Sequence, residues 1–262
     1  MMRLEHHRVD TYVGVGPAYP WGGLYGGQIV AQALRACGNT VEPHYLPHSL
    51  HAYFIRPGDS SEPIRFEVDR LRNGRSFVTR QVVARQSGGA ILTMIASFHV
   101  QEDETSQQVV AMPPVPPPDE LHRDTWSPMF ERAVIERDPD TRRQRAWLRI
   151  AGPLDDDPVL HACALAYMSD DLPTESLVMI HPAWRPDRDS ELEEEWGFMS
   201  ASLDHAVWFH RPSRADDWHL EDFVPGGLSS ARGLTTGNLY SPDGNHIATV
   251  SQEVLLRERR SG

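Results

Sequence analysis

Apolar and polar residues alternate along much of each half of the chain, and in each half this alternation follows a segment that is apolar on most faces. A period of two is typical of half-buried strands, whereas an apolar run with helical spacing indicates a buried helix. In the first half the pattern predicts a strand at 8–14 and a helix at 26–37. Further strands are expected at 49–56, 64–72, 77–86 and 90–100.

The second half shows the same order of elements. A strand is expected at 145–152 and a helix at 158–170, where Pro158 suits the first helical turn and Asp155 to Asp157 favour its positive end. Strands are then expected at 198–211, 218–224, 230–241 and 246–257. A helix followed by a run of antiparallel strands, twice, predicts a sheet wrapped around a long apolar helix in each half.

Two short stretches indicate that the halves are copies. "HAYFIRP" at 51–57 is repeated as "HAVWFHRP" at 205–212. A shift of 155 positions places Phe54 on Phe209, and without a gap the same shift places Gly89 on Gly244. We interpret this as a duplicated domain and not as a short-period repeat.

A proline-rich interval separates the two copies. Residues 111–121 contain five prolines, and proline at this density is excluded from the interior of sheets and helices. We therefore predict an N-terminal domain at 1–106, a Pro-rich linker at 107–125 and a C-terminal domain at 126–262.

Composition excludes several classes of protein. The net charge of −12 argues against a nucleic-acid partner, and no apolar run of 18 residues predicts a membrane span. The chain contains no lysine, which excludes Schiff-base chemistry and a phosphate-loop lysine. Cys37 and Cys163 are expected to be buried free thiols, and without an apolar leader a cytoplasmic location is expected. The thirteen histidines form no H-E-x-x-H pattern, so no metal is expected.

Longer stretches resemble one known family. They are "GGLYGGQIVAQAL", "HSLHAYFIRPGD", "LRNGRSFVTRQVVARQSGGAI", "LDHAVWFHRP", "SSARG" and "VSQEVLLR". Together they are similar to the acyl-CoA thioesterase II family. The resemblance implies an α+β double hotdog fold, in which two tandem units, each a long helix wrapped by an antiparallel sheet, form one continuous sheet. It also implies hydrolysis of acyl-CoA to a free fatty acid and coenzyme A, with no cofactor beyond the substrate's own coenzyme A.

The resemblance also implies a catalytic set in the second half. The "YMSD" motif gives Asp170, the hydroxyl two residues before "DH" gives Ser202, and the final-strand "QE" gives Gln252. The shift of 155 places Pro47 on Ser202 and Ser97 on Gln252, and the first helix has no carboxylate. One site per chain is expected.

These three residue types suit thioester hydrolysis. Thiolate is a good leaving group, because a free thiol has a pKa of about 8.5. Asp170 is expected to take a proton from water, Ser202 to hold that water, and Gln252 to donate to water or to the oxyanion. Direct attack by Ser202 is disfavoured, because the chain has no G-x-S-x-G elbow. Residues 171–197 depart most from the family pattern, so the resemblance implies less about acyl-chain specificity than about the catalytic step.

Binding of the substrate has weaker candidates. Gly26 and Gly27 could offer backbone N–H groups to a carbonyl oxygen or phosphate, or could simply allow a tight turn into the helix. Arg72, Arg75 and Arg232 could bind the phosphates of coenzyme A or could simply be exposed.

The histidines near the repeated motif are interpreted as structural. Asp204 and His205 are adjacent on a strand and face opposite sides, which disfavours a dyad. His205 is therefore expected to be structural, and His48 and His51 to be packing or surface groups.

Two other functions stay open. One is hydration of an enoyl-CoA, which would need an Asp/His pair in one pocket, and the other is non-catalytic acyl-CoA binding. A homo-oligomer is also expected, because a sheet edge or face left exposed could support assembly.

Overall fold

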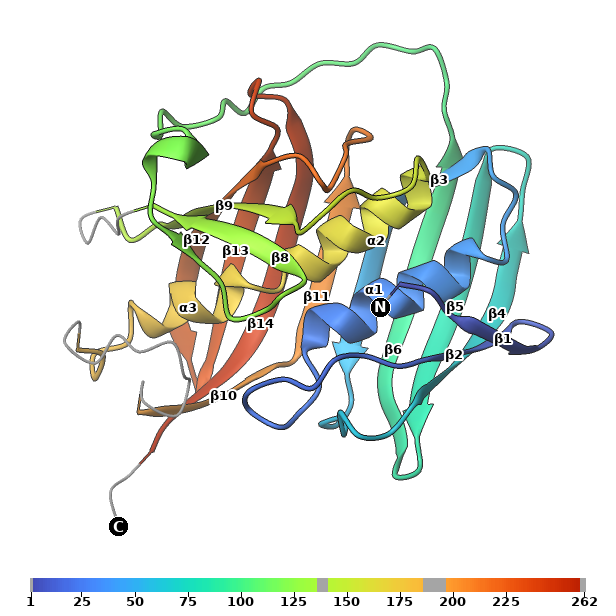
Figure 1. Cartoon of the computed structure of the whole chain (residues 1–262), viewed down its shortest axis with the longest axis horizontal. Helices are drawn as coiled ribbons and strands as arrows, with labels where there is room; N and C mark the ends of the chain where they lie inside the picture. Colours follow the sequence, from blue (N-terminus) through green and yellow to red (C-terminus); the bar gives the residue numbers. More distant parts are fainter. Residues whose placement is uncertain (1, 136–140, 186–196, 260–262) are drawn as a thin grey trace.

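The chain folds around one antiparallel sheet of fourteen strands (Figure 1). The computed structural model describes residues 2–135, 141–185 and 197–259. The first-half strands are β1 (Glu5–Arg8), β2 (Thr11–Gly14), β3 (Tyr45–Phe54), β4 (Ile64–Asn73), β5 (Phe77–Gln86) and β6 (Gly89–Val100). The second-half strands are β7 (Arg123–Asp124), β8 (Phe130–Val134), β9 (Gln144–Ile150), β10 (Phe198–Ser202), β11 (Asp204–Phe209), β12 (His219–Ser229), β13 (Arg232–Tyr240) and β14 (His246–Glu258).

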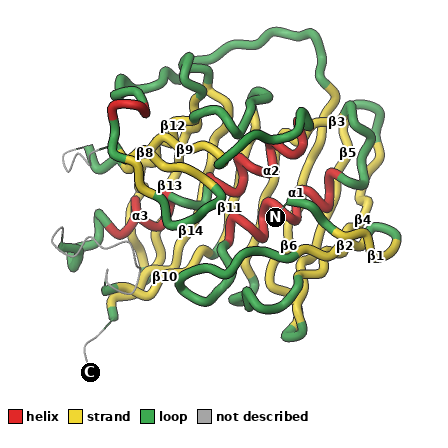
Figure 2. The backbone as a smooth tube through the Cα atoms, in the orientation of Figure 1, coloured by secondary structure: helices red, strands yellow, loops and turns green. Residues whose placement is uncertain are grey.

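The order of the strands is the same on both sides of the centre of the sheet. From the centre outward, β3-β6-β5-β4-β2 on one side corresponds to β11-β14-β13-β12-β9 on the other. β3 and β11 pair antiparallel, with Tyr53 opposite Asp204, and join the halves into one sheet. The two long helices, α1 (Gly26–Gly38) and α2 (Pro158–Met168), lie across the same face (Figure 2). The predicted double hotdog architecture with a continuous sheet is confirmed.

The two long helices are antiparallel and lie in the core. Their residues are almost all buried, as their apolar sequences predict. Asp157 caps α2 by accepting from the backbone N–H groups of Val159 and Leu160, and Pro158 occupies the first turn, as expected. Arg35 in the last turn of α1 forms an ion pair with Asp157 at 2.6 Å. The C-terminus of α1 therefore lies beside the N-terminus of α2.

The copies differ by one residue in one hairpin. β4 and β12 start at Ile64 and His219, in agreement with the shift of 155. Ala84 pairs with Leu92 in the first half, but Leu239 pairs with Ala248 in the second, so the strand after the hairpin is displaced by 156. The ungapped shift of 155 therefore holds up to this hairpin, where Gly89 and Gly244 both have a positive φ, and fails in the strand after it.

This extra residue changes the counterpart of Gln252. Side chains alternate between faces, so a one-residue displacement reverses which positions face the core. Gln252 is fully buried on the inner face, and its counterpart is the buried Ala96 and not Ser97.

The repeated Arg-Pro pair connects each central strand to the neighbouring hairpin. Arg56 donates to the carbonyl of Gly88, and Arg211 Nη1 donates to the carbonyl of His246 at 2.8 Å. The Gly88 carbonyl lies in the turn between β5 and β6, and the His246 carbonyl belongs to the first residue of β14. The repeated motif thus has a structural use in both copies.

Some elements were not predicted. They are the strands β1, β7 and β8, the short helix α3 (Leu172–Val178) and the 3-10 turn Pro118–Glu120. The strand predicted at 198–211 is interrupted at Leu203, because its pairing register with β14 changes by one residue between β10 and β11. Asp204 Oδ1 accepts from the backbone N–H of Glu253 at this break. Within 171–197, residues 186–196 lie outside the described part of the chain.

The proline-rich segment runs between the halves along the surface and contacts the second half (Figure 1). Met112 and Val115 pack against a small second-half apolar cluster that includes Trp147. Trp147 Nε1 also donates to the carbonyl of Pro116 at 2.9 Å. The domain boundaries at 1–106, 107–125 and 126–262 stay a prediction. Among the helices of the described residues, none has the length and apolar content needed to cross a membrane.

Candidate active site

Three elements of the second half bring Asp170, Ser202 and Gln252 together. Asp170 follows the C-terminus of α2, Ser202 ends β10, and Gln252 lies in β14. Ser202 Oγ lies 3.3 Å from Asp170 Oδ1, and Gln252 Nε2 donates to Ser202 Oγ at 2.8 Å. The residues implied by the family resemblance therefore form one connected group.

Asp170 is a buried carboxyl group at the positive end of α1. Gly27 N–H donates to Asp170 Oδ2 at 2.7 Å. Burial raises the pKa of Asp170 to about 6, and hydrogen bonding by Gln252, Gly27 and Ser202 opposes that rise. Asp170 is consequently ionised at neutral pH and is a stronger base than an exposed carboxylate.

The hydrogen bonds of the site form a directed chain. An ionised Asp170 only accepts, so Ser202 donates its one proton to Asp170 and accepts from Gln252 Nε2. The Gln252 Oε1 atom then faces His205 Nδ1, which must carry the proton and donate. His205 Nε2 is left as an acceptor, 2.9 Å from the Ser169 hydroxyl. The chain starts and ends on neighbouring residues, Ser169 and Asp170.

His205 is fully buried and holds the amide of Gln252 in one orientation. Burial lowers the pKa of His205 to about 4, so the ring is neutral at neutral pH and has one donor and one acceptor nitrogen. The prediction that Asp204 and His205 form no dyad agrees with their contacts, because Asp204 bonds to the Glu253 backbone instead. The contact of His205 with Gln252 was not predicted, and it arises between strands that are distant in the sequence.

The two glycines at the start of α1 lie against Asp170. A Cβ atom on Gly26 would lie 2.7 Å from Asp170 Oδ2, and one on Gly27 would lie 2.3 Å from the carbonyl of Tyr167. The Gly27 N–H already donates to Asp170. The Gly26 N–H has no acceptor within the described part of the chain. Of the two, Gly26 is the one whose N–H could meet a substrate oxygen.

The three candidate arginines lie at two separate places on the sheet. Arg72 and Arg75 lie at the exposed β4–β5 turn, whereas Arg232 starts β13 and forms an ion pair with Glu253 at 2.9 Å. Since Glu253 follows Gln252, Arg232 is the one of the three that lies near Asp170, Ser202 and Gln252 along the sheet. Coenzyme A binding by these arginines stays a prediction.

The remaining candidate histidines lie elsewhere. His48 contacts the Ser97 hydroxyl at 2.8 Å, and His51 packs edge-on against Trp208. Neither belongs to the group formed by Asp170, Ser202 and Gln252. Across the described residues, no cluster of three or more His, Cys, Asp or Glu side chains is arranged to hold a metal ion.

Further buried acids surround Asp170. Asp171 accepts from Trp126 Nε1 at 2.6 Å and from Arg132 at 3.2 Å. Glu221 is fully buried, both of its carboxylate oxygens lack a partner among the described residues, and burial raises its pKa well above the usual value. Asp171 is therefore a structural ion-pair partner, whereas burial favours the neutral form of Glu221.

The arrangement defines a class of protein. Two hotdog units contribute the N-terminus of α1 and the group formed by Asp170, Ser202 and Gln252 to one polar site. Such a site can position a water molecule beside a base and hydrogen-bond donors. This is a double hotdog protein with one polar site in each chain.

The comparisons identify its family. A family model described as the acyl-CoA thioesterase C-terminal domain matches residues 107–256, and one described as the N-terminal domain matches residues 16–99. The chain belongs to the acyl-CoA thioesterase family, whose members are hydrolases.

Individual relatives agree with this assignment. Acyl-CoA thioesterase 2 of Haemophilus influenzae is 32% identical over 98% of this chain and 96% of its own length. Acyl-coenzyme A thioesterase 8 of Homo sapiens is 32% identical over 98% of this chain and 88% of its own length. The structure of an acyl-CoA thioesterase II, TesB2, from Mycobacterium marinum has a TM-score of 0.84 and 40% identity, covering 98% of this chain and 96% of its own.

Proposed function

We propose that the chain hydrolyses an acyl-CoA thioester to a free fatty acid and coenzyme A with a water molecule held by Asp170, Ser202 and Gln252. The observation that carries this proposal is the buried, ionised Asp170 at the end of a chain of hydrogen-bond donors. The reaction adds one water across the carbonyl–sulfur bond. It therefore balances without a metal or a redox cofactor, and we propose that none is used.

The chain's own residues account for the proton transfers. Asp170 accepts a proton from water as the oxygen attacks the carbonyl carbon. Ser202, which donates to Asp170, keeps the carboxylate and the water in a fixed relation. The tetrahedral intermediate then breaks its carbonyl–sulfur bond and expels the thiolate. The thiolate takes up the proton held by Asp170, which restores the carboxylate.

The first half of the chain also offers a donor for the developing oxyanion. Gly26 N–H lies at the positive end of α1 and has no acceptor among the described residues. We assign it to the carbonyl oxygen of the substrate. Each half of the chain thus supplies part of one site.

The site does not favour the alternative reactions. An enoyl-CoA hydratase would need Asp and His to reach the substrate together, but both nitrogens of the fully buried His205 are bonded to Gln252 and Ser169. A dehydratase domain of RzxB from Pseudomonas fluorescens, with a TM-score of 0.53 and 10% identity, shares the fold alone. No observation favours non-catalytic binding at this site.

Assembly and location are further proposals. The outer face of the sheet exposes Tyr53, Ile95 and Trp208 on the three neighbouring strands β3, β6 and β11. We propose that this face forms a contact between copies of the chain. The two buried free thiols, Cys37 and Cys163, support a reducing compartment such as the cytoplasm.

A thiol-release assay over acyl-CoA chains of short, medium and long length tests the activity. Equal amounts of free thiol and free acid are expected for at least one chain length. Formation of 3-hydroxyacyl-CoA from enoyl-CoA without thiol release would contradict the proposal.

A further inference from the structure

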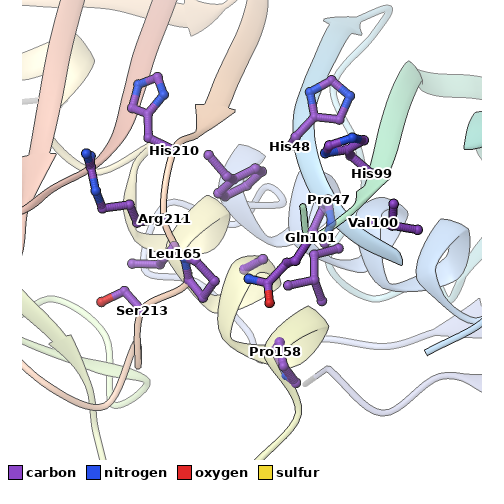
Figure 3. A pocket seen from close by; sticks show the side chains of 14 residues that line it. Pro47, His48, His99, Val100, Gln101, Pro158, Leu165, His210, Arg211 and Ser213 are labelled. Atoms are coloured by element: carbon purple, nitrogen blue, oxygen red, sulfur yellow. The ribbon is translucent and has the colours of Figure 1, made fainter. Parts of the chain in front are cut away.

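A cavity lies at the end of α2 that is opposite to Asp170. It has a volume of about 140 Å³, and its residues come from α2, the ends of β3 and β6, and the segment after β11 (Figure 3). Pro47, Ala162, Leu165 and Phe209 supply apolar walls. None of the proposed catalytic residues lines it, so it is separate from the site described above.

The pseudo-symmetry of the fold relates this cavity to the catalytic site. Central-strand residues correspond by a shift of 155, which relates Pro47 to Ser202 and Phe209 to Phe54. The helices correspond by a shift of 132, since α1 starts at Gly26 and α2 at Pro158. The cavity lies where the symmetry would place a second catalytic site.

The polar groups of the catalytic site are absent from this copy. The helix shift of 132 relates Gly27 to Val159 and Gly38 to Asp170. Gly27 contacts Asp170, and in the other copy Val159 lies close to Gly38, in agreement with this correspondence. The four corresponding pairs are Gly38 for Asp170, Pro47 for Ser202, Ala96 for Gln252 and Leu50 for His205. All four replacements lack a side-chain hydrogen-bonding group, so the second copy keeps a cavity with apolar walls and no means to activate water.

The rim of the cavity is polar and includes one arginine. Arg211, His48 and His210 line it. Burial lowers the pKa values of both histidines, which are therefore neutral at neutral pH. Arg211 donates to a backbone carbonyl and to Ser106, and no carboxylate of the described residues lies within ion-pair distance of it. Its charge is available to an anion.

We propose that this cavity is a second, non-catalytic site that takes the end of an acyl chain whose anionic head group lies at Arg211. The proposal rests on the acyl-CoA thioesterase function, because the cavity is the apolar counterpart of the site for that substrate. Its volume is below the range of about 300–1,000 Å³ that encloses a whole drug-sized ligand, so part of the ligand remains on the surface. A fatty acid and an acyl-CoA share this chemistry.

Binding stoichiometry tests the proposal. The probes are alkyl-CoA thioethers, which cannot be hydrolysed, the matching fatty acids and free coenzyme A, titrated calorimetrically against the full chain. Two thioethers per chain are expected for the wild type. Binding of fatty acid at the second site would identify the product as its ligand, and binding of thioether alone would identify the substrate. Free coenzyme A lacks the chain and is expected not to bind there.

Two independent variants fill the cavity. Val100, at the end of β6, and Ala162, in α2, both line the cavity. The variants Val100→Trp and Ala162→Phe each place a large side chain there. Either variant that folds should reduce the stoichiometry from two to one and leave kcat/KM within twofold of the wild type. Leu71→Trp, at an exposed apolar side chain on β4, is the control and should still bind two thioethers per chain.

The failures of the two proposals are distinguishable. A wild type that releases thiol but binds one thioether per chain would overturn the second site alone. A folded filling variant that still binds two would also overturn it. Absence of thiol release on every acyl-CoA would instead overturn the proposed function.

Discussion

At the scale of single residues, the proposed mechanism depends on the ionisation state of Asp170. Burial raises its pKa to about 6, and the base must be deprotonated to accept a proton from water. The rate is therefore full above this pKa and is lost as the pH falls through it. We predict that kcat/KM decreases about tenfold per pH unit below pH 6. A profile that is flat down to pH 4.5 would contradict this role.

His205 provides a second residue-scale prediction. His205→Leu removes the donor that fixes the Gln252 amide, whereas His205→Asn keeps an amide N–H near the position of Nδ1. We expect kcat to fall about tenfold in the leucine variant, because a lost buried hydrogen bond costs about 1–3 kcal/mol. The acid limb of the pH profile should also move to higher pH, since Asp170 would lose donors.

The asparagine variant is the control. A purely structural His205 would change thermal stability in both variants and leave the acid limb in place. If His205→Asn keeps kcat and the pH profile of the wild type and His205→Leu does not, His205 positions the Gln252 amide.

At the scale of elements, the close contact of α1 with α2 places the base. A Cβ on Gly27 would lie 2.3 Å from the carbonyl of Tyr167, so Gly27→Ala must separate the helices and lengthen the bond to Asp170. We predict a loss of about 1–3 kcal/mol in the free energy of unfolding, together with a lower kcat. Gly88→Ala is the control, because a Cβ there meets no atom within 4 Å. It should change neither the free energy of unfolding nor kcat. Urea unfolding and thiol release measure both effects.

Periodicity predicted the elements that run the length of the sheet, and missed those set by tertiary contacts. The strands 64–72 and 77–86 and the helix 26–37 were predicted because their apolar patterns are long. The helix α3 has seven residues, too few for a helical period to be distinctive. The interruption at Leu203 depends on register with β14, which no local pattern records.

The candidate site could be predicted in part. Family resemblance provided Asp170, Ser202 and Gln252, which the structure brings together. His205 was interpreted from its sequence neighbour Asp204, but its partner is Gln252 on the adjacent strand. The counterpart of Gln252 was misplaced because one extra residue lies in a hairpin with similar glycine-containing turns in both copies.

At the scale of the whole molecule, the two halves share one strand order, and the proposal gives them one polar and one apolar site. The central pair β3–β11 leaves an outer face with Tyr53, Ile95 and Trp208 exposed. We predict that Trp208→Arg lowers the molar mass in light scattering to that of a smaller assembly. A wild-type mass equal to one chain would contradict self-association through this face.

The most direct test of the central claim is the thiol-release rate of Asp170→Asn beside that of the wild type. We predict that kcat falls about 10²–10⁴-fold, the usual contribution of a general base, while the unfolding midpoint is kept. Asp171→Asn is the matched control: it removes a charge that pairs with Arg132, so it should lower stability and spare most of the rate. Wild-type kcat in a folded Asp170→Asn variant would contradict the mechanism.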